Sequence, residues 1–123
     1  MLNPEKELMG ASTAILILSV LATEPSYGYQ VVKRINDESR GLFTWQEGTI
    51  YPALHRLEKS KLVRAQWQDA DSGRRRKYYY ITAAGRQALA AGTAQWKGFH
   101  DLVTRLTGAA HGKSKPKLNS ALA

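Results

Sequence analysis

The sequence contains no cysteine. This absence excludes a disulfide framework, a thiol nucleophile and a zinc site with cysteine ligands. Histidine is scarce as well, and His55, His100 and His111 lie too far apart in the sequence to form a metal-ligand pattern. There is no glycine-rich phosphate loop, and no serine, histidine and acidic residues are spaced as in a catalytic triad. The sequence therefore predicts no enzyme, no cofactor and no metal site.

Long apolar runs are also lacking. The longest, Ala14–Ala22, has nine residues, about half of the ~20 that a membrane-spanning helix needs. Glu5 and Glu7 place negative charge where a secretory leader is normally basic. We therefore expect a cytoplasmic protein that does not bind a membrane through an inserted helix.

Charge is plentiful but unevenly distributed. The net charge is +8, yet residues 1–48 hold four Lys and Arg against six Asp and Glu, whereas residues 49–86 hold nine against three. Positive charge gathered in one segment is typical of a surface that binds a polyanion. Nucleic acid is the first interpretation and an anionic membrane surface the second; the remaining alternative is a solvated face without a binding role.

Two helices are predicted in the acidic first third. The first covers residues 4–22, where Asn3 can cap the helix and Pro4 suits its first position. Apolar residues follow at helical spacing. Ser26 is predicted to cap a second helix, which Gly41 is expected to end.

A third helix is predicted to begin between Gly48 and Tyr51, with Thr49 as its cap, because proline is tolerated best in a first turn and Pro52 must lie there. At 100° per residue, one side of this helix is apolar: Ile50, Ala53, Leu54 and Leu57. The opposite side is marked by proline and basic residues: Pro52, His55, Arg56 and Lys59. Such a helix is a candidate for DNA recognition.

After the third helix, the spacing of apolar residues changes from helical to every second residue. Residues 63–68 alternate apolar and polar side chains, residues 69–73 have the composition of a turn, and residues 78–81 are rich in strand formers. Between the turn and the second strand lie Arg74–Lys77, four consecutive cations. The pattern predicts a β-hairpin with a basic tip.

A last long helix is predicted from the cap Thr82 to about Thr107. Its apolar stripe has heptad-like spacing and requires a partner helix. Residues 108–123 have no periodicity and are expected to form a disordered basic tail. The predicted division is therefore residues 1–82, 83–107 and 108–123.

Three blocks of this sequence occur in a known order and spacing. They are Tyr27–Gln30, Gly48–Glu58, and Lys77–Tyr79 followed by Ile81, Thr82, Gly85 and Arg86. With them, residues 8–106 resemble the PadR family of transcriptional regulators in its short form with one C-terminal helix. One departure is Ser60-Lys61, where a glycine is common before the leucine; we expect it to alter the turn locally.

The resemblance implies a mainly α fold with a small β-hairpin: a winged helix-turn-helix followed by a long C-terminal dimerisation helix. It also implies a homodimer formed by the last helix with help from the first, and usually repression. The third helix would enter the major groove of double-stranded DNA, and the hairpin, or wing, would follow the phosphates. Two-fold symmetry predicts an inverted-repeat operator. The residues expected to contact DNA are Tyr29, Thr49, Tyr51, Pro52, His55, Arg56, Lys59, Arg74, Arg75, Arg76 and Lys77.

The residues expected at the dimer interface are Leu89, Trp96, Phe99, Val103, Leu106, Ile15 and Leu18. Trp96 has two interpretations: an interface anchor, or, as in some short members of the family, a platform on which a planar aromatic effector stacks, with Gly92 leaving room beside the indole. Trp45 and Trp67 are expected to be structural. The alternatives are a winged helix that binds DNA without sensing a ligand, and one that binds protein instead of DNA.

Overall fold

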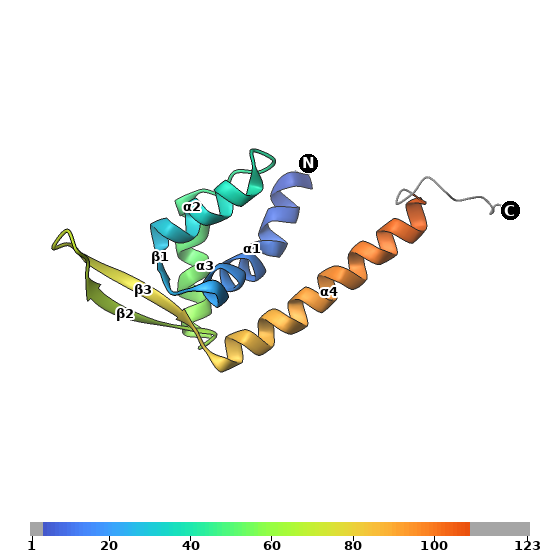
Figure 1. Cartoon of the computed structure of the whole chain (residues 1–123). Coiled ribbons are helices and arrows are strands. Elements are labelled where there is room, and N and C mark those ends of the chain that lie inside the picture. Colours follow the sequence, from blue (N-terminus) through green and yellow to red (C-terminus); the bar gives the residue numbers. More distant parts are fainter. Residues whose placement is uncertain (1–3, 109–123) are drawn as a thin grey trace, which may run out of the picture. The chain divides into compact units, whose positions relative to one another are not determined.

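The computed structural model describes residues 4–108, with side chains from Ser12 onward. The predicted cap Asn3 and residues 109–123 of the predicted tail lie outside this range. The elements are α1 (Pro4–Thr23), β1 (Ser26–Tyr27), α2 (Gly28–Ser39), α3 (Glu47–Lys59), β2 (Val63–Asp69), β3 (Arg75–Ile81) and α4 (Ala83–Thr107) (Figure 1). The chain divides into two compact units, residues 1–90 and residues 91–123, and each is described by itself.

The first unit is built from three helices and a small sheet. Helices α1, α2 and α3 pack against one another, and their apolar faces share one core. Its fully buried side chains include Ile17, Leu21, Val31, Ile50 and Leu54. Since burying a side chain of this size contributes about 1.5–3 kcal/mol, this cluster fixes the orientation of α3 in the unit.

The sheet is antiparallel, with the strand order β1-β3-β2. The hairpin β2–β3 was predicted, and we call it the wing. The short strand β1 was not: Ser26, predicted to cap α2, pairs with Tyr79 in the sheet, and Tyr27 occupies the cap position. A strand of two residues is too short to show a period of two, so the sequence could not indicate it.

Helix α3 begins earlier than predicted. Its cap is Gln46, whose carbonyl accepts hydrogen bonds from the N–H groups of Thr49 and Ile50, both at 3.0 Å. Pro52 is therefore the sixth helical residue and not part of the first turn. Proline has no N–H for the carbonyl of Gly48, but Gly48 is exposed, so water can hydrate that carbonyl.

Helix α4 begins as predicted, because the Thr82 hydroxyl accepts a hydrogen bond from the N–H of Gly85 at 3.0 Å. Leu89, in the first unit, packs against the core. The observed elements confirm the predicted mainly helical fold with a wing and a long C-terminal helix. None of the described helices is long and apolar enough to cross a membrane.

Candidate nucleic-acid interface

The two sides of α3 differ as the sequence predicted. The side that carries Ile50, Ala53, Leu54 and Leu57 is buried in the core. All the α3 residues that we expected to contact DNA are exposed: Thr49, Tyr51, Pro52, His55, Arg56 and Lys59. A helix with such an exposed side has the shape that the major groove admits.

Tyr51, on this exposed side, packs against the start of α2. Its ring lies directly against Gly28 at the start of α2, so closely that a Cβ atom at Gly28 would overlap it. Burial raises the pKa of the Tyr51 hydroxyl, and the negative charge of Glu47 raises it further. The tyrosine is therefore fixed between two helices and keeps its proton.

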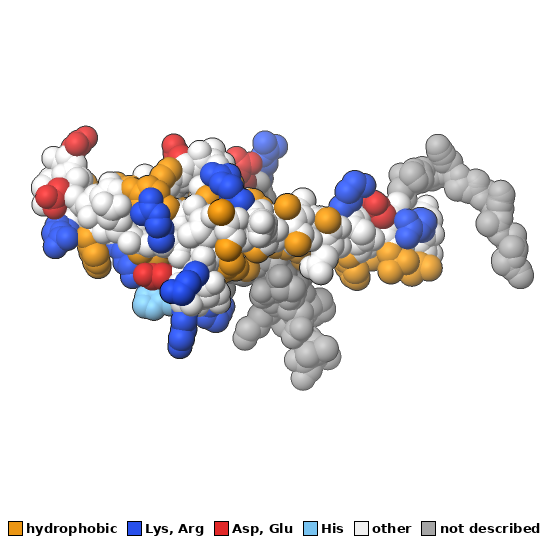
Figure 2. Space-filling view, turned by 90° about the horizontal axis from the view of Figure 1, so that it is seen from below, with side chains coloured by type: hydrophobic (Ala, Val, Ile, Leu, Met, Phe, Trp, Pro, Cys, Tyr) orange, Lys and Arg blue, Asp and Glu red, His pale blue; other side chains and the backbone are white. Residues whose placement is uncertain are grey.

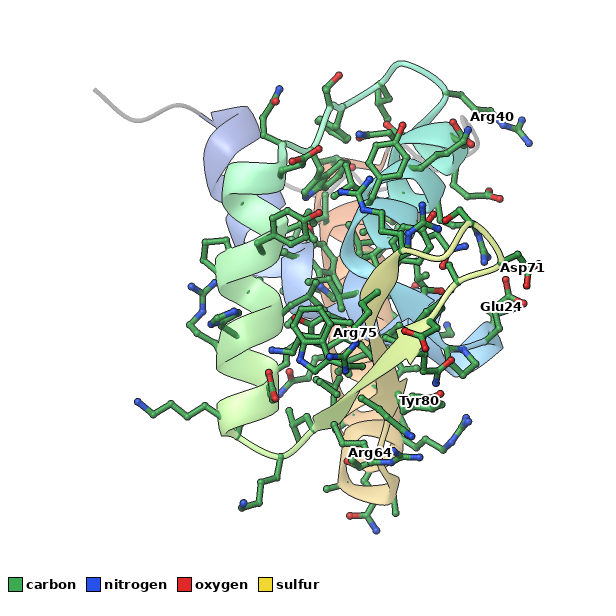
Figure 3. All side chains as sticks on the ribbon, turned by 90° about the vertical axis from the view of Figure 1, so that its left-hand side faces the viewer. Glu24, Arg40, Arg64, Asp71, Arg75 and Tyr80 are labelled. Atoms are coloured by element: carbon green, nitrogen blue, oxygen red, sulfur yellow. The ribbon has the colours of Figure 1, made fainter. Side chains whose placement is uncertain are left out.

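The four cations of the wing do not share one environment. Arg74 lies in the turn, and β3 begins at Arg75. Because side chains alternate along a strand, Arg75 and Lys77 lie on the side of Tyr79, whereas the Arg76 guanidinium lies 4.3 Å from the ring centroid of Tyr27 on the other side. Figure 3 shows Arg75 between the wing and α3.

The outer side of the sheet holds a second cation–aromatic contact. The Arg64 guanidinium lies 4.2 Å from the ring centroid of Tyr80, on the side of the wing away from α3 (Figure 3). Tyr27 and Tyr78 meet edge to face there, with 5.4 Å between their ring centroids. The two cation–aromatic contacts hold the guanidinium groups of Arg64 and Arg76 over rings instead of leaving them loose in solvent.

Lys77 connects the wing to α3. Its ammonium group lies 3.2 Å from a carboxylate oxygen of Glu58. Burial alone would lower the pKa of Lys77, but the hydrogen bond to Glu58, together with the charge of Glu58 and the interactions with Tyr79, outweighs it, and the pKa is raised. Lys77 was expected to contact DNA; the structure gives this charge a partner within the protein, so it is less free for a phosphate than Arg74.

A groove with a volume of about 580 Å³ lies between the start of α3 and the wing. It brings together six of the residues that we expected to contact DNA: Tyr29, Tyr51, Arg74, Arg75, Arg76 and Lys77. The other predicted residues of α3 do not line it. Five lining residues were not among those predicted: Tyr27, Gly28, Glu47, Trp67 and Tyr79.

Trp67 shows why the sequence missed part of the groove. Its position in the alternating strand places it on the same side as Val63 and Ala65, so we expected it to pack in the sheet. Instead the side chain is 56% exposed, and the Arg75 guanidinium lies 5.6 Å from its ring centroid. Only Trp45 packs as expected, at 5% exposure.

The residues expected at a dimer interface fall into two groups. Leu18 is buried in the core and offers no free surface, and Ile15 is half-buried. In the second unit, Phe99, Val103 and Leu106 are exposed. Leu102, which we did not predict, is exposed with them, although the spacing of three and four residues from Phe99 and Leu106 indicates the same stripe.

The stripe follows one side of the helix. Figure 2 shows hydrophobic side chains gathered along one side of the C-terminal half of α4 and charged side chains along the other. Trp96 is half-buried, with its ring edge to face with Phe99 at 6.1 Å between centroids. Across the described residues, no three potential ligands from His, Cys, Asp or Glu gather to hold a metal ion.

Comparison with known proteins is consistent with this geometry. Residues 17–91 match the model of the transcriptional regulator PadR-like family. The transcriptional regulator Rv3488 of Mycobacterium tuberculosis is 34% identical over 84 residues, which are 68% of this chain and 75% of that protein. The crystal structure of a PadR family transcriptional regulator from Eggerthella lenta superposes with a TM-score of 0.73 at 35% identity, covering 84% of this chain and 88% of that one.

A longer relative matches as well. The transcriptional regulator YqjI of Escherichia coli is 28% identical over 109 residues, which are 88% of this chain but 50% of YqjI, so the chain spans about half of that relative. The family match covers the end of α1, then α2, α3, the wing and the start of α4, and it includes every residue that lines the groove. The chain belongs to the PadR-like family of transcriptional regulators, which are DNA-binding regulators.

Proposed function

We propose that this protein is a homodimeric repressor that binds an inverted-repeat operator in double-stranded DNA. The observation that supports the proposal most directly is the groove, in which Glu47 and Tyr51 at the start of α3 and the arginines of the wing come together. In this arrangement α3 contacts base edges in the major groove, and the wing contacts phosphates, which position a protein without specifying the sequence. The two half-sites are expected about one helical turn, ~34 Å, apart.

The wing is tested by its salt dependence. Arg74, Arg75 and Arg76 are changed together to Ala, while Lys77 is kept because it pairs with Glu58. Each lost phosphate contact should reduce the slope of log affinity against log salt by ~0.9, and operator and random DNA should be affected alike. An unchanged slope in fluorescence-anisotropy titrations would remove the wing from the interface.

The dimer is proposed on the exposed apolar stripe of α4. Large side chains such as Phe99 and Leu106 gain roughly 1.5–3 kcal/mol each when buried, and several buried together would hold two copies in a stable dimer. Phe99→Asp should give monomers with weak operator binding, because it would bury an unpaired charge. Lys97→Asp, on the charged side of the same helix, is the control. Sedimentation that finds a dimer for Phe99→Asp would contradict the assignment.

We further propose that a planar aromatic effector stacks on Trp96 and releases the repressor from DNA by shifting its conformational equilibrium. The half-buried indole beside Phe99 supports this role. In a background with Trp45 and Trp67 changed to Phe, planar aromatics should quench the fluorescence of Trp96 and weaken operator binding. A panel of such compounds that does neither leaves Trp96 as an interface anchor and the protein as a regulator without an effector.

A further inference from the structure

Glu47 stands out in the groove because of its charge. Among the described residues that line the groove it is the one acid, beside Arg74, Arg75, Arg76 and Lys77. It is the first residue of α3 and is exposed.

The neighbouring cations take other acidic partners. Arg75 lies 3.8 Å from a carboxylate oxygen of Asp69, and Lys77 pairs with Glu58. Within the described part of the chain Glu47 forms no ion pair. Burial raises the pKa of the Tyr51 hydroxyl, and the negative charge of Glu47 raises it further. The carboxylate is therefore free to accept hydrogen bonds from a ligand in the groove.

A carboxylate is poorly suited to a groove that holds only phosphates. It carries the same charge sign as the DNA backbone, so its presence there weakens binding unless it accepts a hydrogen bond from a donor on the DNA. The donors exposed in the major groove are amino groups on base edges. The first residues of a recognition helix are those that usually reach these edges.

Cytosine is the base that fits. Guanine presents the acceptors N7 and O6, thymine presents the acceptor O4, and adenine presents the acceptor N7 beside its amino group, so each would place an acceptor against the carboxylate. Cytosine presents its N4 amino group as a donor. We propose that Glu47 is a specificity-determining residue that selects cytosine at one position of each half-site; this inference rests on the proposed operator binding.

A helix-stabilising role is the competing explanation. An acidic residue in the first turn interacts favourably with the helix dipole whether or not DNA is bound. That role affects the melting temperature of the protein but gives no preference among bases. The base preference therefore separates the two explanations.

The experiment selects binding sites from random double-stranded DNA with the full chain and three variants. Glu47→Gln should change the preferred base from cytosine to adenine, because an amide side chain pairs with N6 and N7 of adenine. Glu47→Ala should lose the preference, which for wild type is expected to be roughly 5- to 150-fold over the other bases. Glu38→Gln removes the same charge from an exposed residue of α2 outside the groove and should select the wild-type site.

Two results would overturn the inference. The first is a wild-type site without a selected cytosine in its half-sites, which needs no variant. The second is a Glu47→Gln or Glu47→Ala protein, folded by circular dichroism, that selects the wild-type base with the same strength. If wild type selects no sequence at all, the proposed operator binding fails, and this inference fails with it. The inference is confirmed if the Glu47 variants change the selected base and Glu38→Gln does not.

Discussion

The end of α3 offers a prediction whose size follows from the backbone. Lys61 has φ = 65°, in the left-handed region that suits glycine. Its N–H donates to the carbonyl of Glu58 at 3.0 Å, and the N–H of Leu62 donates to that of Leu57 at 2.9 Å. This pair of bonds is the Schellman ending of a helix, in which the left-handed residue is usually glycine. We expect Lys61→Gly to stabilise the protein.

The expected gain follows from two opposing effects. The left-handed conformation costs a residue with a Cβ atom roughly 1–2 kcal/mol, and Lys61→Gly removes that cost. Glycine also makes the unfolded chain more flexible, which offsets about 0.4–1 kcal/mol of it. The middle of these ranges gives a rise of about 0.8 kcal/mol in the free energy of unfolding, with limits of about 0 and 1.6 kcal/mol. The middle value corresponds to ~3–6 °C in melting temperature.

The backbone around Lys61 cannot relax into another turn. Its carbonyl accepts a hydrogen bond from the Thr82 hydroxyl at 2.8 Å, so the wing and the start of α4 depend on this conformation. Thermal unfolding at fixed protein concentration measures the effect. Lys61→Ala is the matched control, because it removes the same charged side chain but keeps the Cβ atom. Equal stabilities for Lys61→Ala and Lys61→Gly would refute the reasoning.

Three further substitutions follow from the packing. In Gly85→Ala the new Cβ would overlap the carbonyl oxygen of Leu62, so unfolding in urea should show a loss of about 1–3 kcal/mol or more. A Cβ atom added at Gly98 would meet no other atom within 4 Å, so Gly98→Ala should show a gain of up to ~1 kcal/mol from helix propensity in the same assay. A loss of stability would mean that the surface at Gly98 is covered. Asn36 holds the loop before α3 by bonds of 3.0 and 2.7 Å to the backbone of Trp45, and Asn36→Ala should cost about 1–3 kcal/mol; an unchanged stability would show that other contacts fix the loop.

The fold could be predicted where apolar residues repeat at a regular spacing over many positions or where a residue clearly caps a helix. The helical spacing indicated α1 and α3, the alternation in residues 63–68 indicated β2, and the cap at Thr82 fixed the start of α4. The start of α3 was misplaced because the argument rested on one proline. A solvent-exposed carbonyl at Gly48 tolerates the loss of one hydrogen bond, and no local pattern reveals that exposure.

The site was harder to predict than the fold, since a groove depends on which elements meet. The sequence indicated the exposed side of α3, because the buried side is an uninterrupted apolar stripe. It did not indicate Gly28 or Tyr27, which reach the groove through the short strand β1 and the start of α2. Glu47 was missed for a similar reason: before the start of α3 was known, it belonged to the preceding loop.

The basic run of the wing shows what folding adds to a charge pattern. In the sequence, Arg74–Lys77 are four equal cations, and charge alone predicts four similar contacts with phosphates. In the structure the alternation of side chains along β3 places Arg76 and Arg75 on opposite sides of the strand. Arg76 lies against the ring of Tyr27, whereas Arg75 lies beside Trp67 and Asp69. Lys77 forms an ion pair with Glu58 of α3. One cation therefore links the wing to the helix expected to contact bases, and the arginines supply the charge that phosphates would meet. This division couples the position of the wing to that of α3, so both parts can contact the same stretch of DNA.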